Sequence, residues 1–283
     1  MYRDSLFNDQ RIGLVFAHPD DEVIFASSLI QDCSKIILCY SAVKSNPVIS
    51  KGRRMLKEIY PIENTKFLEL TEPNRAPYSE QFNDWRFPVE TEFGLKSHQR
   101  NLNDDEDNFN KLFLSLKDHL MDLDIVVTHN PWGEYGHPHH ILVNRVISKI
   151  ANIYNFQIYV PGVFSLKSKN LMMAASHRLN TQAEIIKADK DIARELQGLY
   201  IQNNCWTWKT SDCSPNINVF YRQTKNDFNP AQSEVKSNYA TEHLFQFIDK
   251  DYRIHTFTEF ILMTRVGFLI EACVKLKKII FGK

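Results

Sequence analysis

Glycine is scarce in this sequence, and neither sign of charge is in excess. Only 9 of 283 residues are glycine, and prolines number 11. This composition excludes collagen-like and low-complexity proteins. Lysines and arginines number 34, as do aspartates and glutamates. A net charge of zero removes the overall attraction to polyanions on which nucleic-acid binding depends, so we expect no nucleic-acid partner.

Cysteines are few and odd in number. Three of the five, Cys33, Cys39 and Cys273, lie inside apolar runs, which is typical of reduced thiols in a cytosolic protein rather than of a disulfide framework. The longest stretch without Asp, Glu, Lys or Arg covers 150–166 and contains Asn, Gln and Pro, so it is a poor transmembrane candidate. The first ten residues are polar and do not resemble a signal peptide. We therefore expect a cytoplasmic location.

Several enzyme motifs are also missing. The sequence contains no GxSxG, no P-loop and no GxGxxG, which removes the usual signals for a serine hydrolase, a P-loop NTPase and a dinucleotide-binding enzyme. Apolar residues make up 43% of the chain and charged residues 24%. These proportions are typical of a globular protein with a full core.

Short apolar runs alternate with segments of helical periodicity. Buried strands are predicted at 12–17, 35–41, 65–70, 124–129 and 157–160, and helices at 23–31, 50–60, 109–120, 141–151 and, from a capping box at Thr181 and Glu184, up to Tyr200. Strands that alternate with helices indicate a parallel sheet covered by helices on both faces, which is an α/β fold.

The pattern divides the chain into a main domain and an extension. Residues 1–205 carry the alternating pattern, with a long insertion loop at 72–103 that is rich in proline and asparagine. Residues 206–283 show weaker periodicity, and we interpret them as a C-terminal appendage that packs on the domain, on a partner subunit or on a membrane. In a parallel sheet the ligand site lies beyond the carboxyl ends of the strands.

Two loops at that edge concentrate the reactive side chains. The sequence AHPDDE directly follows the first strand, and THNPWGEYGHPHH spans residues 128–140 at the end of the fourth. Together they hold five of the ten histidines and four carboxylates. We expect these groups to meet at one edge of the sheet.

This set of side chains matches the ligands of a catalytic zinc, which takes three His, Asp or Glu side chains and leaves one position for water. His18 can bind from the strand end, and Asp21 can turn back toward it if a helix begins there. The third ligand is then His140 or His137. Asp20 remains available as a general base, and Glu22 as a partner that orients a ligand imidazole. Taken alone, however, the acidic run is equally typical of a helix start.

The paired motifs resemble those of the LmbE/PIG-L family of zinc-dependent N-acetylglucosaminyl deacetylases. The resemblance runs through about residues 11–203 and includes a weaker match around Lys190 and 200–202. It implies a Rossmann-like fold and removal of the N-acetyl group from an amino sugar in carbohydrate metabolism. By position, it implies one Zn²⁺ per chain on His18, Asp21 and His140, with Asp20 as the general base. His137 would stabilise the oxyanion or protonate the leaving amine.

One position of the second motif departs from the family pattern. The family often has Asp where this chain has His139, and that Asp would orient His137. A histidine cannot do so as an anion. The departure puts the details of acid catalysis in question, and it permits an alternative in which the chain binds a glycan without turning it over.

Four further residues are candidates for contact with a substrate. Arg53 or Arg54 could hold a hydroxyl or a phosphate, although an exposed helix arginine is an equal alternative. Trp132 could stack on a sugar face or pack in the core. His129 could border the pocket or serve as a hydrogen-bonded structural histidine.

Other interpretations remain open at the level of sequence. His18 and Asp20 with the distant His140 also fit the facial triad of an Fe(II) oxygenase, but such a triad is expected on an all-β fold. The tail at 253–283 is basic with apolar clusters, as in an amphipathic helix that contacts a membrane surface from the cytoplasmic side or packs on a partner. Homo-oligomerisation is equally open. The sequence does not identify the acetylated sugar.

Overall fold

We describe the protein from a computed structural model. It describes residue 7 and residues 9–73, 90–95, 102–208, 215–224, 245–249, 251–256 and 258–262. Most of the 72–103 insertion and the apolar clusters of the tail after residue 262 lie outside these ranges. Within the tail at 253–283, where an amphipathic helix was expected, residues 254–256 form a strand and 258–262 a short helix, and the residues after 262 lie outside these ranges.

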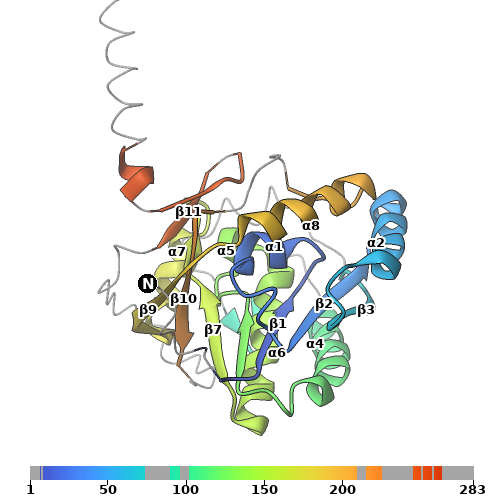
Figure 1. Cartoon of the computed structure of the whole chain (residues 1–283). Helices are drawn as coiled ribbons and strands as arrows, with labels where there is room; N and C mark the ends of the chain where they lie inside the picture. The colour runs from blue at the N-terminus through green and yellow to red at the C-terminus, as the bar shows by residue number, and fades with distance from the viewer. Residues whose placement is uncertain are drawn as a thin grey trace, which may run out of the picture.

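A seven-stranded sheet forms the centre of the molecule (Figure 1). Its order is β3-β2-β1-β6-β7-β10-β9, and the first five strands run parallel. The strands are β1 (Ile12–Phe16), β2 (Lys35–Ala42), β3 (Thr65–Thr71), β6 (Ile125–Thr128), β7 (Gln157–Pro161), β9 (Leu179–Lys187) and β10 (Ile217–Gln223). The parallel part has the Rossmann-like order, in which the chain changes direction between β1 and β6. The α/β prediction is confirmed.

Helices cover both faces of this sheet, because successive side chains of a strand point to opposite sides. Leu14 and Phe16 of β1 pack with α1 (Asp21–Ala26), α2 (Pro47–Ile59) and α8 (Lys190–Gln202). Val15 instead packs in a second cluster with α4 (Leu102–Leu116) and α6 (Pro138–Tyr154). Apolar side chains therefore cover both faces of the sheet, and the polar side chains of the two motifs lie at the strand ends.

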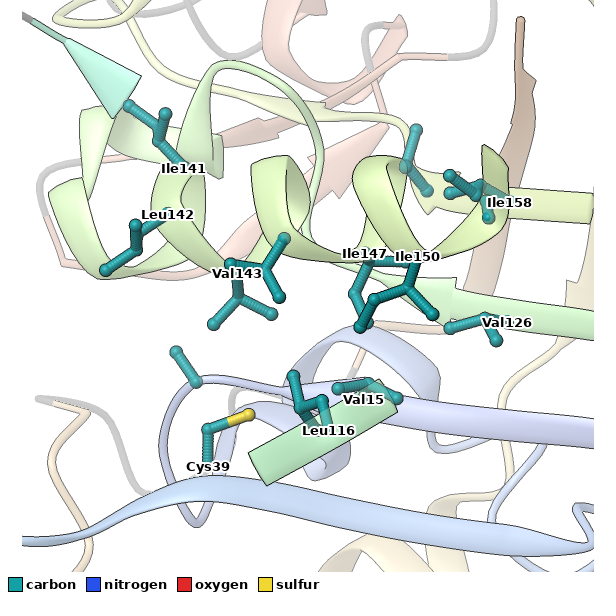
Figure 2. Packing of buried hydrophobic residues seen from close by; sticks show 14 of the residues in the cluster. Val15, Cys39, Leu116, Val126, Ile141, Leu142, Val143, Ile147, Ile150 and Ile158 are labelled. Atoms are coloured by element: carbon teal, nitrogen blue, oxygen red, sulfur yellow. The ribbon is translucent and has the colours of Figure 1, made fainter. Parts of the chain in front are cut away.

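Helix α6 is apolar on most of its surface because it packs on the sheet and on α4 together. Ile147 and Ile150 lie over Val126, and Val143 lies near Leu116 of α4 (Figure 2). All five of these side chains are fully buried. This packing fixes the position of α6, whose first turn carries His139 and His140.

The capping-box prediction at Thr181 and Glu184 is wrong. This segment is strand β9, and α8 begins only at Lys190, where the carboxylate of Asp189 accepts bonds from the backbone N–H groups of Asp191 and Ile192. Strand β9 pairs with β10, which lies about 30 residues further along the chain. A pairing partner that distant overrides the local helix signal.

The expected boundary at residue 205 also needs correction. Strand β10 belongs to the region interpreted as an appendage, yet it lies inside the main sheet, antiparallel to both β7 and β9.

Two smaller sheets accompany the main one. One contains β8 (Val163–Phe164), β11 (Gln246–Ile248) and β12 (Ile254–Thr256), and the other is a hairpin of β4 (Glu90–Thr91) and β5 (Gly94–Leu95).

The remaining helical segments are α5 (Gly133–Gly136), α7 (Lys169–Ala175) and two 3₁₀ turns, Lys117–His119 and Ser176–Arg178. Within the described part of the chain, no helix is both long and apolar enough to cross a membrane.

Two glycines in helices give a matched test of the packing between α2 and α8. A Cβ atom on Gly52 would overlap the backbone carbonyl oxygen of Asn203, whereas a Cβ atom on Gly198 would meet no atom within 4 Å. We expect Gly52→Ala to lower the free energy of unfolding by about 1–3 kcal/mol, as for other overpacked sites. Gly198→Ala should raise it by about 0.5–1 kcal/mol. Urea unfolding of both variants checks this, and equal effects would contradict the described packing.

Candidate metal centre

The two motifs meet where the order of the sheet reverses. Strands β1 and β6 are adjacent and parallel, with Val15 opposite Thr128. His18 and His129 therefore leave the sheet at the same edge, and α5 and α6 follow directly after β6. The predicted convergence of the two loops is confirmed.

Three donor atoms from these loops lie at a uniform spacing. Nδ1 of His18 is 3.1 Å from Oδ2 of Asp21. Nε2 of His140 is 3.3 Å from the same His18 nitrogen and 3.4 Å from the Asp21 oxygen. Ligands bonded to zinc at 2.0–2.1 Å in a tetrahedron are separated by about 3.3 Å. The three atoms thus match three corners of a zinc coordination shell, and the residues are those that the sequence analysis named.

The electrostatics of this group favour a cation. Burial alone would raise the pKa of Asp21, but the rings of His140 and His18 hold it well below its ordinary value. Burial likewise opposes the charged form of His140, but Asp21 and Glu134 raise its pKa to about 9. The two carboxylates therefore attract positive charge to Nε2 of His140, and a divalent ion can take the place of a proton there.

Glu134, which the sequence analysis left without a role, is the carboxylate that holds the imidazoles. Its Oε2 lies 2.6 Å from Nδ1 of His140 and 3.2 Å from Nδ1 of His129. Its Oε1 accepts the backbone N–H of Asn130 at 3.0 Å. Since Nδ1 of His140 donates to a carboxylate, its Nε2 is left to bind the ion. The sequence signal was present, because Glu134 lies between the two histidines in the same motif.

Strained backbone accompanies these carboxylates. Asp20 has φ 105° and Glu134 has φ 53°. Residues other than glycine rarely adopt these φ values, and such backbone strain clusters at functional sites.

Asp20 presents one engaged oxygen and one without a partner. Its Oδ2 accepts the hydroxyl of Thr207 at 2.6 Å and the backbone N–H of the same residue at 2.8 Å. Its Oδ1 is buried and has no hydrogen-bond partner. Burial and the adjacent Asp21 carboxylate raise the pKa of Asp20 well above its ordinary value. The vacant buried oxygen suits a general base, which needs an acceptor atom within reach of the proton it takes.

Glu22 does not orient an imidazole, and that prediction is wrong. Its Oε1 accepts the hydroxyls of Tyr60 at 2.8 Å and Tyr200 at 2.6 Å, and its Oε2 accepts the backbone N–H of Asp20 at 3.0 Å. Burial raises the pKa of Glu22 to about 7. Glu22 therefore holds the strained backbone of Asp20 rather than a ligand.

His137 lies beside the donor atoms at the N-terminus of α6. Its ring stacks on His140 with centroids 4.3 Å apart and meets His18 at 4.8 Å. Nδ1 of His137 accepts the backbone N–H of His139 at 3.2 Å, so in the neutral ring Nε2 carries the hydrogen. His137 can therefore donate a hydrogen bond. The ring of His139 lies 4.9 Å from that of His137, centroid to centroid, and its Nδ1 is within hydrogen-bond distance of His18.

The four candidate substrate residues differ in position. Arg53 is buried, lines a cavity beside the site, and donates to Glu72 and to the carbonyl of Tyr40. Arg54 is exposed and does not line that cavity.

The two aromatic candidates have structural roles. Trp132 is fully buried, and its indole N–H donates to the carbonyl of Val163 at 2.7 Å, so it packs in the core. His129 is also fully buried; it bonds to Glu134 and accepts the backbone N–H of Ala17 at 2.9 Å. Neither lines the cavity.

The cavity beside the donor atoms has a volume of about 790 Å³. His18, Asp21 and His137 lie in its wall. Three aromatic side chains form another part of that wall, with ring centroids 5.8–6.1 Å apart: Tyr135, Trp208 and Tyr252. Two of these, like Thr207, come from beyond residue 205. The region interpreted as an appendage thus completes the site.

Comparisons with known proteins match the part of the chain that holds the two motifs. A family model described as PIG-L, GlcNAc-PI de-N-acetylase, matches residues 14–151. This segment of the chain is similar to the PIG-L family. Both motifs and all three candidate ligands fall within it. The family description names de-N-acetylases, which are amide hydrolases.

A relative in Acanthamoeba polyphaga mimivirus, the uncharacterized protein L374, is 24% identical over 197 residues, which cover 68% of this chain and 80% of the viral protein. Similar solved structures include the zinc-inhibited form of the teicoplanin deacetylase Orf2, at 13% identity and a TM-score of 0.48 over 77% of this chain and 100% of the other. The N,N'-diacetylchitobiose deacetylase of Pyrococcus horikoshii matches at 15% identity and a TM-score of 0.40 over 71% and 73%.

Proposed function

We propose that this protein is a zinc-dependent hydrolase that removes the acetyl group from an N-acetyl amino sugar and releases acetate and a free amine. The observation that carries the proposal is the set of three donor atoms on His18, Asp21 and His140 at tetrahedral spacing. Asp20 stands next to them in the chain and has a buried oxygen without a partner.

The donor set supports zinc as the ion, at one per chain. Two imidazole nitrogens and one carboxylate oxygen are a common zinc set that leaves a fourth position open. When bound, such an ion acidifies a water molecule and polarises a carbonyl oxygen. The facial-triad alternative requires Asp20 as a ligand, but the carboxylate oxygen at tetrahedral spacing from the two histidine nitrogens belongs to Asp21. The α/β fold also argues against the oxygenase.

Two side chains can then carry out the proton transfers, Asp20 as the acceptor and His137 as the donor. Oδ1 of Asp20 can accept the proton of the attacking water, since nothing else occupies it. Nε2–H of His137 can donate to the oxyanion that develops from the acetamide, or to the leaving nitrogen. Thr207 holds the Asp20 carboxylate in place through two bonds to its other oxygen.

The cavity supports a substrate larger than one sugar ring. Its volume of about 790 Å³ lies in the upper part of the range for ligand pockets, which is about 300–1,000 Å³. The aromatic wall of Tyr135, Trp208 and Tyr252 offers flat apolar faces on which a second sugar ring or an aglycone can pack. We therefore favour a GlcNAc-type glycoside or glycoconjugate, in line with the substrate named in the family description.

Metal content and acetate release test this function. We expect about one zinc per chain, and acetate release from at least one member of a panel of N-acetylglucosaminides with and without an aglycone. Chelation should abolish release, and added Zn²⁺ should restore it. A chain that takes up no zinc would overturn the proposal. Zinc without turnover across the panel would favour the non-catalytic glycan-binding alternative.

A further inference from the structure

His139 lies between a candidate metal ligand and a backbone carbonyl. Its Nδ1 is 3.0 Å from Nε2 of His18, and its own Nε2 is 3.1 Å from the carbonyl oxygen of Pro73. The side chain is buried. The position is the one where the motif departs from the family pattern, and the ring is aimed at His18 rather than at His137.

The carbonyl of Pro73 decides where the hydrogen of His139 lies. A carbonyl oxygen only accepts hydrogen bonds, so Nε2 of His139 must carry a hydrogen to bond with it. In the neutral ring the other nitrogen, Nδ1, then has a lone pair and accepts. The backbone of the segment after β3 thereby sets the tautomer of His139.

The tautomer of His139 in turn sets the tautomer of His18. Because Nδ1 of His139 accepts, Nε2 of His18 must donate, and the single hydrogen of the neutral His18 ring is on Nε2. Nδ1 of His18 then has a lone pair that faces Oδ2 of Asp21 at 3.1 Å and Nε2 of His140 at 3.3 Å. Nδ1 is the nitrogen that belongs to the tetrahedral set of donor atoms.

A competing partner for His18 is weaker. Oε1 of Glu72 lies 3.7 Å from Nε2 of His18, compared with 3.0 Å for Nδ1 of His139. The Glu72 oxygen also accepts a bond from Arg53 at 2.9 Å. Donor–acceptor distances in N–H···O hydrogen bonds lie within about 2.7–3.2 Å, so the Glu72 contact is too long to be one. His139 is therefore the group that orients the His18 ring.

We propose that His139 is a positioning residue that relays the polarity of the Pro73 carbonyl to His18 and holds its Nδ1 ready to bind the metal ion. The inference rests on the proposed metal site and deepens it. Nearly all metal-binding histidines donate their second nitrogen to a carboxylate, a carbonyl or water. Here a second histidine is inserted between the ligand and the carbonyl.

Two variants of His139 distinguish the effect of its acceptor atom, Nδ1, from the effect of its side-chain volume. In His139→Asn, the amide oxygen can occupy the place of Nδ1 and still accept from His18. In His139→Gln, the terminal amide can reach the place of Nε2 and bond to Pro73, but no acceptor lies at the place of Nδ1. Both side chains are polar and similar in size, so a general packing effect would change the two variants alike.

Zinc affinity measured by competition with a chelator is the main readout. We expect His139→Gln to weaken zinc binding about 10- to 100-fold, as for other partners of metal ligands, and His139→Asn to stay within about threefold of wild type. The visible absorption of the Co²⁺-loaded chain should change in the Gln variant and be retained in the Asn variant. Nitrogen-15 spectra of the histidine rings should show His18 protonated at Nε2 in wild type and Asn variant only.

Equal affinities for wild type and His139→Gln would overturn the inference, as would an equal loss in both variants. If a variant fails to fold, the ring tautomer of His18 in the wild-type chain decides, and a hydrogen on Nδ1 overturns the relay. A wild-type chain that binds zinc but releases no acetate would overturn the proposed hydrolase alone, since the affinity ratio requires no turnover. A wild-type chain that binds no metal would overturn both.

Discussion

Replacing Asp20 by asparagine is expected to lower kcat for acetate release by about 100- to 10,000-fold, the usual contribution of a general base. The amide of Asn can still accept both bonds from Thr207 through its oxygen. Its NH₂ group then occupies the place of Oδ1 and cannot accept a proton. Zinc content should be unchanged, because Asp21 and not Asp20 belongs to the tetrahedral set. Steady-state kinetics together with zinc analysis of the same sample check both parts.

The matched control for this change is Asp118→Asn. Asp118 is an exposed aspartate in the 3₁₀ turn Lys117–His119, and its replacement should leave kcat and zinc content as in wild type. If Asp20→Asn released acetate at the wild-type rate, the base would have to be another group. If it lost zinc as well as activity, Asp20 would be a ligand, as in the facial-triad alternative.

The position of the site could be predicted because it depends on local patterns. The apolar run 12–17 and the run 124–129 each indicate a buried strand; the first is followed directly by His18 and the second ends at His129. Parallel strands end at the same edge of a sheet, so the two loops had to meet there. No information about distant contacts was needed for that step.

The roles of several side chains could not be predicted, because they depend on the direction in which each side chain points. Trp132 and His129 lie in the second motif, yet both point into the core, where Val163 and Glu134 bond to them. Glu22 follows the two candidate aspartates directly in the chain, but its carboxylate accepts the hydroxyl of Tyr200. Residue type and spacing do not encode these orientations.

Elements whose partners are distant in the chain were also beyond prediction. Strand β9 carries a helix-like capping pattern and becomes a strand only because β10 pairs with it. Thr207 bonds to Asp20 across 187 positions of sequence. The boundary placed at residue 205 failed for the same reason: weak periodicity does not show that a segment contributes to the main sheet or to the site.

Glu134→Gln is expected to weaken zinc binding about 10- to 100-fold, the usual effect of losing the partner of a metal-binding histidine. The structure explains why glutamine cannot substitute. Oε2 of Glu134 accepts from two imidazole nitrogens, and Oε1 accepts the backbone N–H of Asn130. An amide has one oxygen and one NH₂ group. In either orientation its NH₂ group therefore faces at least one buried donor.

The same conflict should lower the free energy of unfolding, because each buried donor left unpaired costs about 1–3 kcal/mol. Urea unfolding in excess chelator measures this cost separately from the loss of metal. Glu69→Gln is the matched control: Glu69 pairs with Lys57 at the surface with its side chain 82% exposed, and exposed pairs contribute below about 1 kcal/mol. Wild-type zinc affinity and stability in Glu134→Gln would show that the carboxylate between His129 and His140 does not orient the ligand. The tetrahedral spacing of the donors would then have to arise from the packing of α6 alone.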